Sequence, residues 1–325
     1  MEKNNGQAAV FNQRSDQNSI IAKVHLGKVT LLSVVIAALN SETTIDRTIS
    51  SVFSNSPPNE EFEVIVVDNG STDNTVEAAK KYPVRLFSCV KRGQGAARNL
   101  GIAKAKGQIV CFTDSDIIVP ENWLVKISEF FIHFPHTDGV GGPVSAPTSK
   151  YLSNIQRLEG EVYTRTHPFP TRKVESKFGD HIGSLYSSNC AYRKDVLISA
   201  NCFDESGLDA VDIDLCWKLV LKGKHIVFNP EIKVVHLGFP SSLKDVFRQQ
   251  FRWGESRVKL NMRYPAARTT STGLKKRIFQ YYFFFLLLAQ IMYSRNRAKS
   301  ILQLFEKCAF TCGCINAYLR SYFCH

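Results

Sequence analysis

Gln108-Ile-Val-Cys-Phe-Thr-Asp-Ser-Asp116 joins a short apolar run to two carboxylates. Gly107 precedes it, and a bounded run of this length is typical of a strand that is covered on both faces. In open α/β sheets ligands bind outside the carboxyl ends of the strands, so Asp114 and Asp116 would face a ligand. The segment therefore predicts a parallel sheet with a binding site at one edge.

The sequence before this segment alternates between strand and helix signals. Apolar runs at 31–39, 63–67 and 84–87 predict three more strands. The helices expected between them are marked by residues that share a face or begin a helix: Ile45, Ile49, Val52 and Phe53; Ser71 to Asp73, opening a helix through Lys81; and Ala96, Leu100 and Ala103. Such alternation predicts a doubly wound α/β fold with a mixed, mainly parallel sheet flanked by helices.

The second half of the chain gives weaker signals. They predict a helix from Pro120 to Phe134, turns at Gly139, Gly141, Gly142 and Pro143, a helix at 212–221, a strand at 234–236 and a helix from Ser242 towards Asn261. Residues 145–185 show no period, which fits either a mobile substrate-facing segment or an ordinary surface loop.

The composition is that of a globular protein, with 44% hydrophobic and 22% charged residues. A net charge of +12 indicates a phosphate-bearing partner, which is a nucleotide, a nucleic acid or an anionic membrane surface. Nine cysteines without a CxxC pair favour a reduced compartment. Residues 1–29 are expected to be a disordered tail, because they begin without the apolar stretch of a secretory signal.

The C-terminal part, residues 263–325, differs from the domain expected at 30–262. Ile278 to Tyr293 is almost wholly apolar but shorter than the roughly 20 residues of a spanning helix, and cations flank it. We expect an amphipathic or hydrophobic helix in the interface of an anionic membrane, with a buried core helix as the alternative. The protein would then be cytoplasmic and peripheral on the inner face of the cell membrane. The domain itself would divide into a nucleotide-binding half, 30–118, and an acceptor half, 119–262.

Asp114 and Asp116 are candidate ligands of a divalent cation, Mg²⁺ or Mn²⁺. Two carboxylates can hold such an ion and leave positions open for phosphate oxygens, whose charge the ion neutralises as a diphosphate departs. His236, at the end of a predicted strand, is a candidate imidazole ligand of the same ion. The alternatives are a solvated acidic loop and a structural histidine.

Asp212-Ile-Asp214 begins a predicted helix. A carboxylate on the acceptor side could remove the proton of an attacking hydroxyl group, which makes Asp212 a candidate general base. The alternative is that these carboxylates only satisfy the free N–H groups of a helix start.

Two further segments have side chains suited to a nucleotide. Val67-Asp-Asn-Gly-Ser-Thr-Asp73 follows a strand, so its Asp68 and Asn69 would face the crevice of Asp114 and could bind a base or ribose. Turn and cap chemistry is the alternative. Lys91-Arg-Gly-Gln-Gly95, followed by Arg98, is suited to phosphates.

Gln249-Gln-Phe-Arg-Trp253 lies on a predicted helix, where Gln249 shares a face with Arg252 and Trp253. Such a face can hold a diphosphate and stack against a sugar. The alternative is an amphipathic helix with Phe251 and Trp253 packed inside.

In this order the segments resemble glycosyltransferase family 2, inverting enzymes with the nucleotide-binding fold called GT-A. The similar motifs, within residues 31–262, are the opening strand and turn, Leu32 to Glu42; the nucleobase segment, Val66 to Asp73; the helix opening, Gly95 to Gly101; the metal motif, Thr113 to Asp116; and the acceptor-side segments, Phe203 to Glu205 and Asp212 to Cys216. The resemblance implies transfer of a hexose-type sugar from a nucleotide-diphosphate sugar to a hydroxyl acceptor, which is a sugar, a lipid-linked sugar or a polysaccharide. It implies cell-surface polysaccharide or glycolipid synthesis, without nucleic acid as a partner.

The resemblance also implies roles for single residues. Nucleotide contacts fall on Ala38, Glu42, Asp68, Asn69 and Arg98; Asp114, Ser115 and Asp116 lie near the ribose and the metal; His236 matches a metal-side histidine; and Asp212 matches the base. Gln249, Arg252 and Trp253 are similar to the polysaccharide-synthase signature that holds the donor diphosphate and the acceptor end.

Three positions depart from the family pattern. Ala37 stands where Pro is usual, Asn69 where a second Asp is common, and Val211 where an acidic residue usually precedes the base. With Asn69 an amide must accept the N–H of a uracil ring, so UDP is the favoured carrier but not a fixed one. The part of the chain after Trp253 is too short for the several spanning helices of processive synthases, which favours addition of a single sugar.

Two other functions fit parts of the sequence. A sugar-nucleotide pyrophosphorylase also uses a metal and a doubly wound sheet, but needs a phosphate loop rich in Gly and Lys where Asn40-Ser-Glu42 stands. A non-catalytic basic scaffold for nucleic acid or membrane would explain the net charge of +12.

Overall fold

The first part of the fold follows the predicted alternation of strand and helix. The computed structural model describes residues 31–55, 61–147, 153–166, 173–176, 184–268 and 297–323. Its first elements are β1 (Leu32–Ala38), α2 (Ile45–Phe53), β2 (Phe62–Asp68), α3 (Thr75–Ala79), β3 (Arg85–Ser88), α4 (Gln94–Lys104) and β4 (Ile109–Asp114). The expectations for residues 1–29 and for Ile278 to Tyr293 lie outside the described residues.

The remaining elements follow Asp116 in the chain. They are β5 (Ile117–Ile118), α5 (Trp123–His133), β6 (Gly139–Gly141), β7 (Val144–Ser145), α6 (Asn154–Thr166), β8 (Val174–Glu175), β9 (Cys190–Arg193), α7 (Lys194–Ser199), α8 (Val211–Leu221), β10 (Ile226–Phe228), β11 (Val234–His236), α9 (Leu243–Arg263), the 3₁₀ turn η1 (Pro265–Arg268) and α11 (Arg297–Phe323). In the described residues of the segment without a period, the chain forms the helix α6 and the short strand β8.

The central sheet has eight strands in the order β3-β2-β1-β4-β9-β6-β10-β8. The first four are parallel, β9 is antiparallel to both of its neighbours, and β6 and β10 are again parallel. A second sheet joins β5, β11 and β7. The prediction of a doubly wound, mixed and mainly parallel α/β fold is confirmed.

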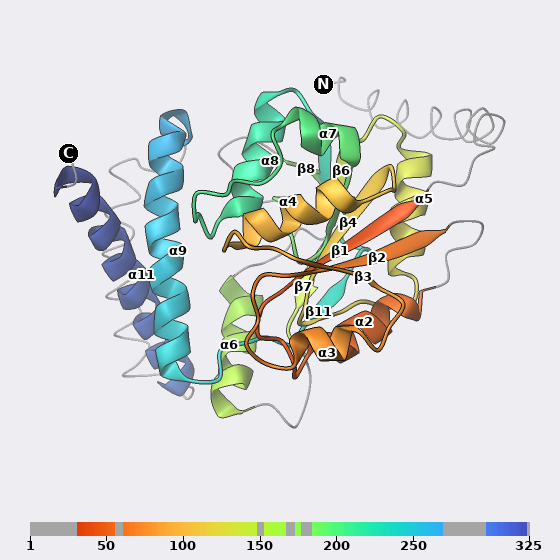
Figure 1. Ribbon diagram of the computed structural model, residues 1–325. Helices are drawn as coiled ribbons and strands as arrows, with labels where there is room; N and C mark the ends of the chain where they lie inside the picture. The colour runs from red at the N-terminus through yellow and green to blue at the C-terminus, as the bar shows by residue number, and fades with distance from the viewer. Residues whose placement is uncertain are drawn as a thin grey trace, which may run out of the picture.

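Helices cover both faces of the central sheet, as Figure 1 shows. Alternate residues of β1 point to opposite faces: Val35 packs in the core under α4, α7 and α8, whereas Val34 and Ile36 pack in the core against α2, α3 and α5. Both cores bury strands that are apolar on each face, which is why these strands read as continuous apolar runs.

The predicted turns at Gly139 and Gly141 are wrong, because both residues belong to β6. A side chain at Gly139 would meet the ring of Tyr192, and a Cβ at Gly141 would lie 2.6 Å from the carbonyl oxygen of Asn189. Both of these neighbours belong to or adjoin β9. The glycines therefore permit a close approach between two paired strands rather than a reversal of the chain.

Helix boundaries and faces also differ in places from the predictions. α3 ends at Ala79 rather than Lys81, and α5 begins at Trp123 rather than Pro120. Ala103, expected on the buried face of α4, is exposed. Gly101 takes its place, since a Cβ there would run into the side chain of Val35. The sequence pattern missed this because a glycine carries no apolar signal.

α9 and α11 form a closely packed pair beside the α/β body (Figure 1). α9 begins as predicted, with the Ser242 hydroxyl accepting a hydrogen bond from the Asp245 N–H at 3.2 Å. Gly254 and Gly313 let the two backbones approach, and Cys314 donates to the carbonyl oxygen of Gly254 at 3.3 Å. Within the described ranges, no helix combines the length and apolar character needed to span a bilayer.

Candidate active site

Three parallel strands end at one edge of the central sheet and carry the first acidic residues of the site. In the strand register Asp68 of β2 stands opposite Ala38 of β1, and Asp114 of β4 stands opposite Ala37. The two carboxylates therefore flank the end of β1. This is the carboxyl edge at which the sequence predicted a binding site.

Asp114 forms an ion pair with Arg98. The Arg98 guanidinium on α4 lies 2.6 Å from the Asp114 carboxylate, and only 3% of the Arg98 side chain is exposed. The same guanidinium lies over the ring of Phe203, 5.7 Å from its centroid. A buried cation thus stands beside the sheet edge, where it can contact a phosphate or ribose oxygen.

Asp116 is paired with His236. The second sheet places β11 antiparallel to β5, so His236 Nε2 lies 3.2 Å from Asp116 Oδ2. Burial opposes the ionised form of Asp116, but the charge of His236 and its hydrogen bond outweigh it and lower the pKa of the carboxyl. Burial likewise opposes protonation of His236, and Asp116 outweighs it and raises the pKa of the ring.

The pair of Asp116 and His236 is the candidate site for a divalent cation. A carboxylate and a neutral imidazole are both metal ligands, and a bound cation would replace the proton of their 3.2 Å contact. In the part of the chain that the structure describes, no group of three or more His, Cys, Asp and Glu side chains is arranged to hold a metal ion. Mg²⁺ is usually held by one or two carboxylates with substrate phosphates and water, so of this pair only Asp116 is a typical Mg²⁺ ligand. Direct ligation by Asp114, which faces Arg98, stays a prediction.

The turn after β1 is held to its neighbours by side chains. The hydroxyl groups of Ser41 and Ser115 are 2.6 Å apart, which joins the β1 turn to the Asp114–Asp116 segment. Glu42 accepts hydrogen bonds from the backbone and side-chain N–H groups of Asn74 at 3.0 and 3.1 Å. Ala38 is buried and accepts from the N–H of Asn69 at 2.9 Å.

Asp68 and Asn69 shape the two loops that border the predicted nucleobase site. Asp68 accepts hydrogen bonds from the N–H groups of Gly70 and Ser71. The Asn69 amide donates to the carbonyl oxygens of Cys89 and Lys91 at 3.3 and 2.8 Å and accepts from the N–H of Gly93 at 2.8 Å. Turn chemistry is therefore present, and contact of either residue with a base stays a prediction.

Asp212 lies near the ion pair of Arg98 and Asp114. It is half-buried in the first turn of α8, where its carboxylate accepts from the N–H of Ile213 at 2.9 Å. Burial raises the pKa of the Asp212 carboxyl; Arg98 acts in the opposite direction, and the negative charge of Asp114 adds to the increase. Asp212 is thus close enough to the Arg98–Asp114 ion pair to feel both charges, and a shared site for the three residues stays a prediction. A carboxylate with a raised pKa is a stronger base than an ordinary one.

The match to a family model agrees with this arrangement. Residues 33–199, just over half of the chain, match the model described as glycosyl transferase family 2. The chain belongs to glycosyltransferase family 2. This membership favours a transferase over the pyrophosphorylase and the non-catalytic scaffold.

Curated relatives of this family 2 chain include two synthases. Poly-beta-1,6-N-acetyl-D-glucosamine synthase of Staphylococcus epidermidis is 26% identical over 264 residues, which are 79% of this chain and 62% of that protein. The synthase of the same name from Staphylococcus aureus is 25% identical over 238 residues, 71% of this chain and 56% of the other. The chain thus spans less than two thirds of the length of these relatives.

Solved structures show the GT-A fold. A mannosyltransferase from Pyrobaculum calidifontis, in complex with GDP-Man and Mn²⁺, has a TM-score of 0.59 at 17% identity and covers 95% of this chain and 97% of its own. Residues 1–349 of Staphylococcus aureus TarS, in complex with UDP-GlcNAc, have a TM-score of 0.51 at 19% identity, covering 90% and 91%. Likenesses at this identity concern the fold alone.

The helix α9 lies beyond the residues that match the family model and contacts the loop that precedes Asp212. Arg252 is exposed and pairs with Asp209, Nε to Oδ2 at 3.1 Å, in the loop just before Asp212. Gln249 is half-buried, and Trp253 is 36% exposed. The alternative of a buried Trp253 is therefore wrong, whereas Phe251 stacks on Phe247 as an ordinary packing residue. Contact of Gln249, Arg252 and Trp253 with a diphosphate or sugar stays a prediction.

Sequence reasoning missed three residues of this region. Ser41 forms a hydrogen bond with Ser115, and Asp209 forms an ion pair with Arg252. Arg263 forms ion pairs with both Asp204 and Asp214. Each contact joins segments far apart in the chain. Asp204 lies within the predicted acceptor-side segment Phe203 to Glu205 and Asp209 follows it, but no local pattern shows which cation pairs with each one.

Proposed function

We propose that this chain is a metal-dependent, inverting glycosyltransferase that moves a hexose-type sugar from a nucleotide-diphosphate sugar to a hydroxyl acceptor. One observation carries the proposal: the Arg98–Asp114 ion pair, whose charges both act on Asp212, stands at the carboxyl edge of the sheet, and Asp116, two residues further on, pairs with His236. A donor diphosphate needs cations, and an acceptor hydroxyl needs a base; this edge offers both.

Asp116 and His236 would hold the cation, Mg²⁺ or Mn²⁺. When bound, the ion neutralises charge on the departing diphosphate. Arg98, buried and 2.6 Å from Asp114, supplies a second fixed positive charge. A fixed cation in a dry site stabilises developing charge more strongly than water does.

Asp212 would act as the general base. The acceptor oxygen attacks the anomeric carbon, the bond from that carbon to the diphosphate oxygen breaks, and the hydroxyl proton passes to Asp212. Attack from the face opposite the leaving group inverts the configuration. Burial keeps the pKa of Asp212 above its ordinary value, so the carboxylate accepts the proton more readily.

The donor carrier proposed is UDP. The support is the bound UDP-GlcNAc of TarS, whereas the bound GDP-Man of the mannosyltransferase points to the competing carrier. Asn69 bears on this choice through its three hydrogen bonds to the loop at 89–93, which would border the base. Ala38, Glu42 and Asp68 would contact the rest of the nucleoside.

The proposed process is cell-surface polysaccharide or glycolipid synthesis by addition of single sugars. The poly-N-acetylglucosamine synthases named above support the process. We further propose that the protein is peripheral on the inner face of the cell membrane, which its net charge of +12 supports through attraction to anionic lipid. Flotation with anionic liposomes tests this, and equal recovery with neutral liposomes would argue against it.

Nucleotide sugars and metal provide the first experiment. A panel of UDP- and GDP-sugars is tested for thermal stabilisation with and without Mn²⁺, because a ligand of the native state raises the melting temperature. Turnover and product length are then measured with the donor that binds. Asp212→Asn should retain donor binding and lose about 100-fold or more in kcat. Asp195→Asn, an exposed carboxylate on α7, is the matched control and should behave as wild type. Equal kcat in Asp212→Asn and wild type would remove the base assignment.

A further inference from the structure

The segment just before α8, the helix that carries Asp212, is held on two sides by its neighbours. We call residues 202–209, which connect α7 to α8, the bridge segment. On the α4 side the Asn99 amide donates to the Phe203 carbonyl oxygen at 3.0 Å and to Glu205 at 2.7 Å, and Lys91 pairs with Glu205 at 2.6 Å. A Cβ at Gly95 would collide with the backbone of Asp204, so the segment lies directly on α4.

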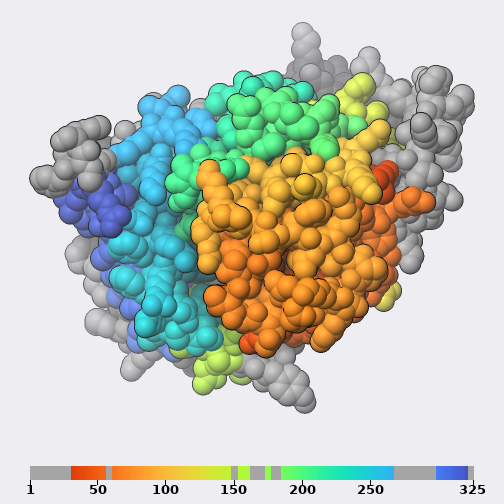
Figure 2. Space-filling model, in the orientation of Figure 1, coloured from red at the N-terminus to blue at the C-terminus, as the bar shows by residue number. Residues whose placement is uncertain are grey.

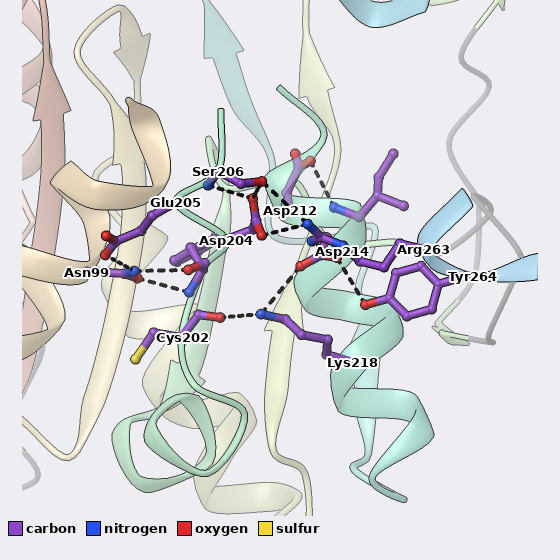
Figure 3. A network of polar contacts seen from close by, with 12 residues as sticks. Asn99, Cys202, Asp204, Glu205, Ser206, Asp212, Asp214, Lys218, Arg263 and Tyr264 are labelled. Atoms are coloured by element: carbon purple, nitrogen blue, oxygen red, sulfur yellow. Dashed lines mark hydrogen bonds and ion pairs between the residues drawn. The ribbon is translucent and has the colours of Figure 1, made fainter. Parts of the chain in front are cut away.

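Arg263 holds the other side of the bridge segment (Figure 3). It is the last residue of α9, and its guanidinium lies 2.8 Å from Asp204 in the bridge and 2.8 Å from Asp214 in α8. One planar group therefore spans two carboxylates of different elements. Arginine suits this position because its donors form a fork, whereas a lysine offers a single point charge.

Asp214 is fully buried and faces away from the site. Besides Arg263 it accepts a hydrogen bond from the Tyr264 hydroxyl at 3.0 Å and lies 3.4 Å from Lys218. Residues two apart on a helix point about 200° apart, so Asp212 and Asp214 occupy opposite sides of the first turn of α8. Anchoring Asp214 from behind consequently fixes the rotation of α8 that aims Asp212 towards Arg98.

We propose that Arg263 is a positioning residue for the base: it sets the orientation of Asp212 by joining α8 to the bridge segment, without touching substrate. The inference rests on the proposed function. Its physical basis is that a shift of about 1 Å at a reacting group costs up to roughly 100-fold in rate.

Arg263→Gln is the main test, made in the full-length protein. We expect kcat to fall by about 10- to 100-fold while the donor KM stays within about twofold. The acid limb of the pH profile of kcat should move to lower pH, because a displaced Asp212 regains water and loses the burial that raises its pKa. Arg263→Lys keeps one ion pair and should give a smaller change in the same direction; it decides the question if Arg263→Gln does not fold.

Arg248→Gln is the matched control. Arg248 is on the same helix in an exposed pair with Asp245 at 3.8 Å, and its loss should leave kcat, KM and the pH profile unchanged. A kcat for the Arg263 variants within twofold of wild type, or a lower kcat with an unmoved acid limb, would overturn the positioning role. Absence of turnover by wild type with every nucleotide sugar would overturn the proposed function and this inference together, which separates the two failures.

Discussion

Replacing Gly313 with Ala is expected to destabilise the protein, although alanine is the better helix former. In a helix interior that exchange is ordinarily favourable by about 1 kcal/mol. Here a Cβ on Gly313 would lie 1.9 Å from the carbonyl oxygen of Phe251 on α9. Ordinary contact begins at 3.4 Å, and 3.4 minus 1.9 is 1.5, so α11 must move by about 1.5 Å.

The displacement would break specific contacts between α9 and α11. Cys314 donates to Gly254 at 3.3 Å, and Asn316 donates to Glu255 at 2.7 Å. Two such bonds are worth about 2 kcal/mol and overpacking costs about 2 kcal/mol. Subtracting about 1 kcal/mol of helix propensity leaves a net loss of about 3 kcal/mol.

Urea unfolding followed by circular dichroism measures this difference. Thr311→Ala is the control, since Thr311 is exposed on the same helix and its replacement gains propensity without a collision. We expect the Thr311 variant to be neutral or slightly more stable than wild type. A Gly313→Ala protein as stable as wild type would refute the steric argument and the close packing on which it depends.

Two further predictions concern charge. Arg98 lowers the pKa of Asp212, so Arg98→Gln should move the acid limb of the kcat profile to higher pH and raise the donor KM; an unmoved limb contradicts this. Burial and Glu159 raise the pKa of Glu306 from 4.5 to about 8, so the folded state prefers the neutral carboxyl: its contribution to stability is present below pH 4.5 and lost as the pH rises through about 8. Glu306→Gln should reduce this loss of stability with rising pH. In wild type the loss amounts to a few kcal/mol, at about 1.4 kcal/mol per pKa unit. Equal unfolding free energies for the two proteins across pH 5–9 would argue against this role of Glu306.

The sequence was sufficient for the nucleotide-binding half because its signals are local. Each buried strand is a continuous apolar run, and parallel strands must end at one edge of the sheet. Asp68 and Asp114 could therefore be placed at the same edge of the sheet from the sequence alone. The pairing of His236 with Asp116 depends on β11 lying next to β5, which no local pattern encodes. The place of His236 at a strand end and the family resemblance suggested only that both residues could bind the same ion.

The acceptor half was less predictable because its contacts join distant segments. Gly139 and Gly141 carry the usual turn signal, yet they lie in the strand β6, whose partner β9 is distant in the sequence. Val140, for example, pairs with Ala191, 51 residues later. The ion pairs of Arg252 and Arg263 depend on how α9 crosses α8, which no local period encodes. Exposure of Trp253 was equally undecided, since an aromatic residue on an amphipathic helix fits either face.

The helix α9 contacts both the loop before Asp212 and the helix α8 that carries Asp212. Arg252 meets Asp209, Ser256 accepts a hydrogen bond from the Asp209 N–H at 2.9 Å, and Arg263 meets Asp204 and Asp214. From Arg252 to Arg263 the helix rises about 16 Å at 1.5 Å per residue. Figure 2 shows α9, in cyan to light blue, on the same face as the segments of residues 31–118, in red to yellow. Because a helix of this length is stiff, contacts spread along it fix the bridge segment in rotation as well as in position, which a single ion pair could not do.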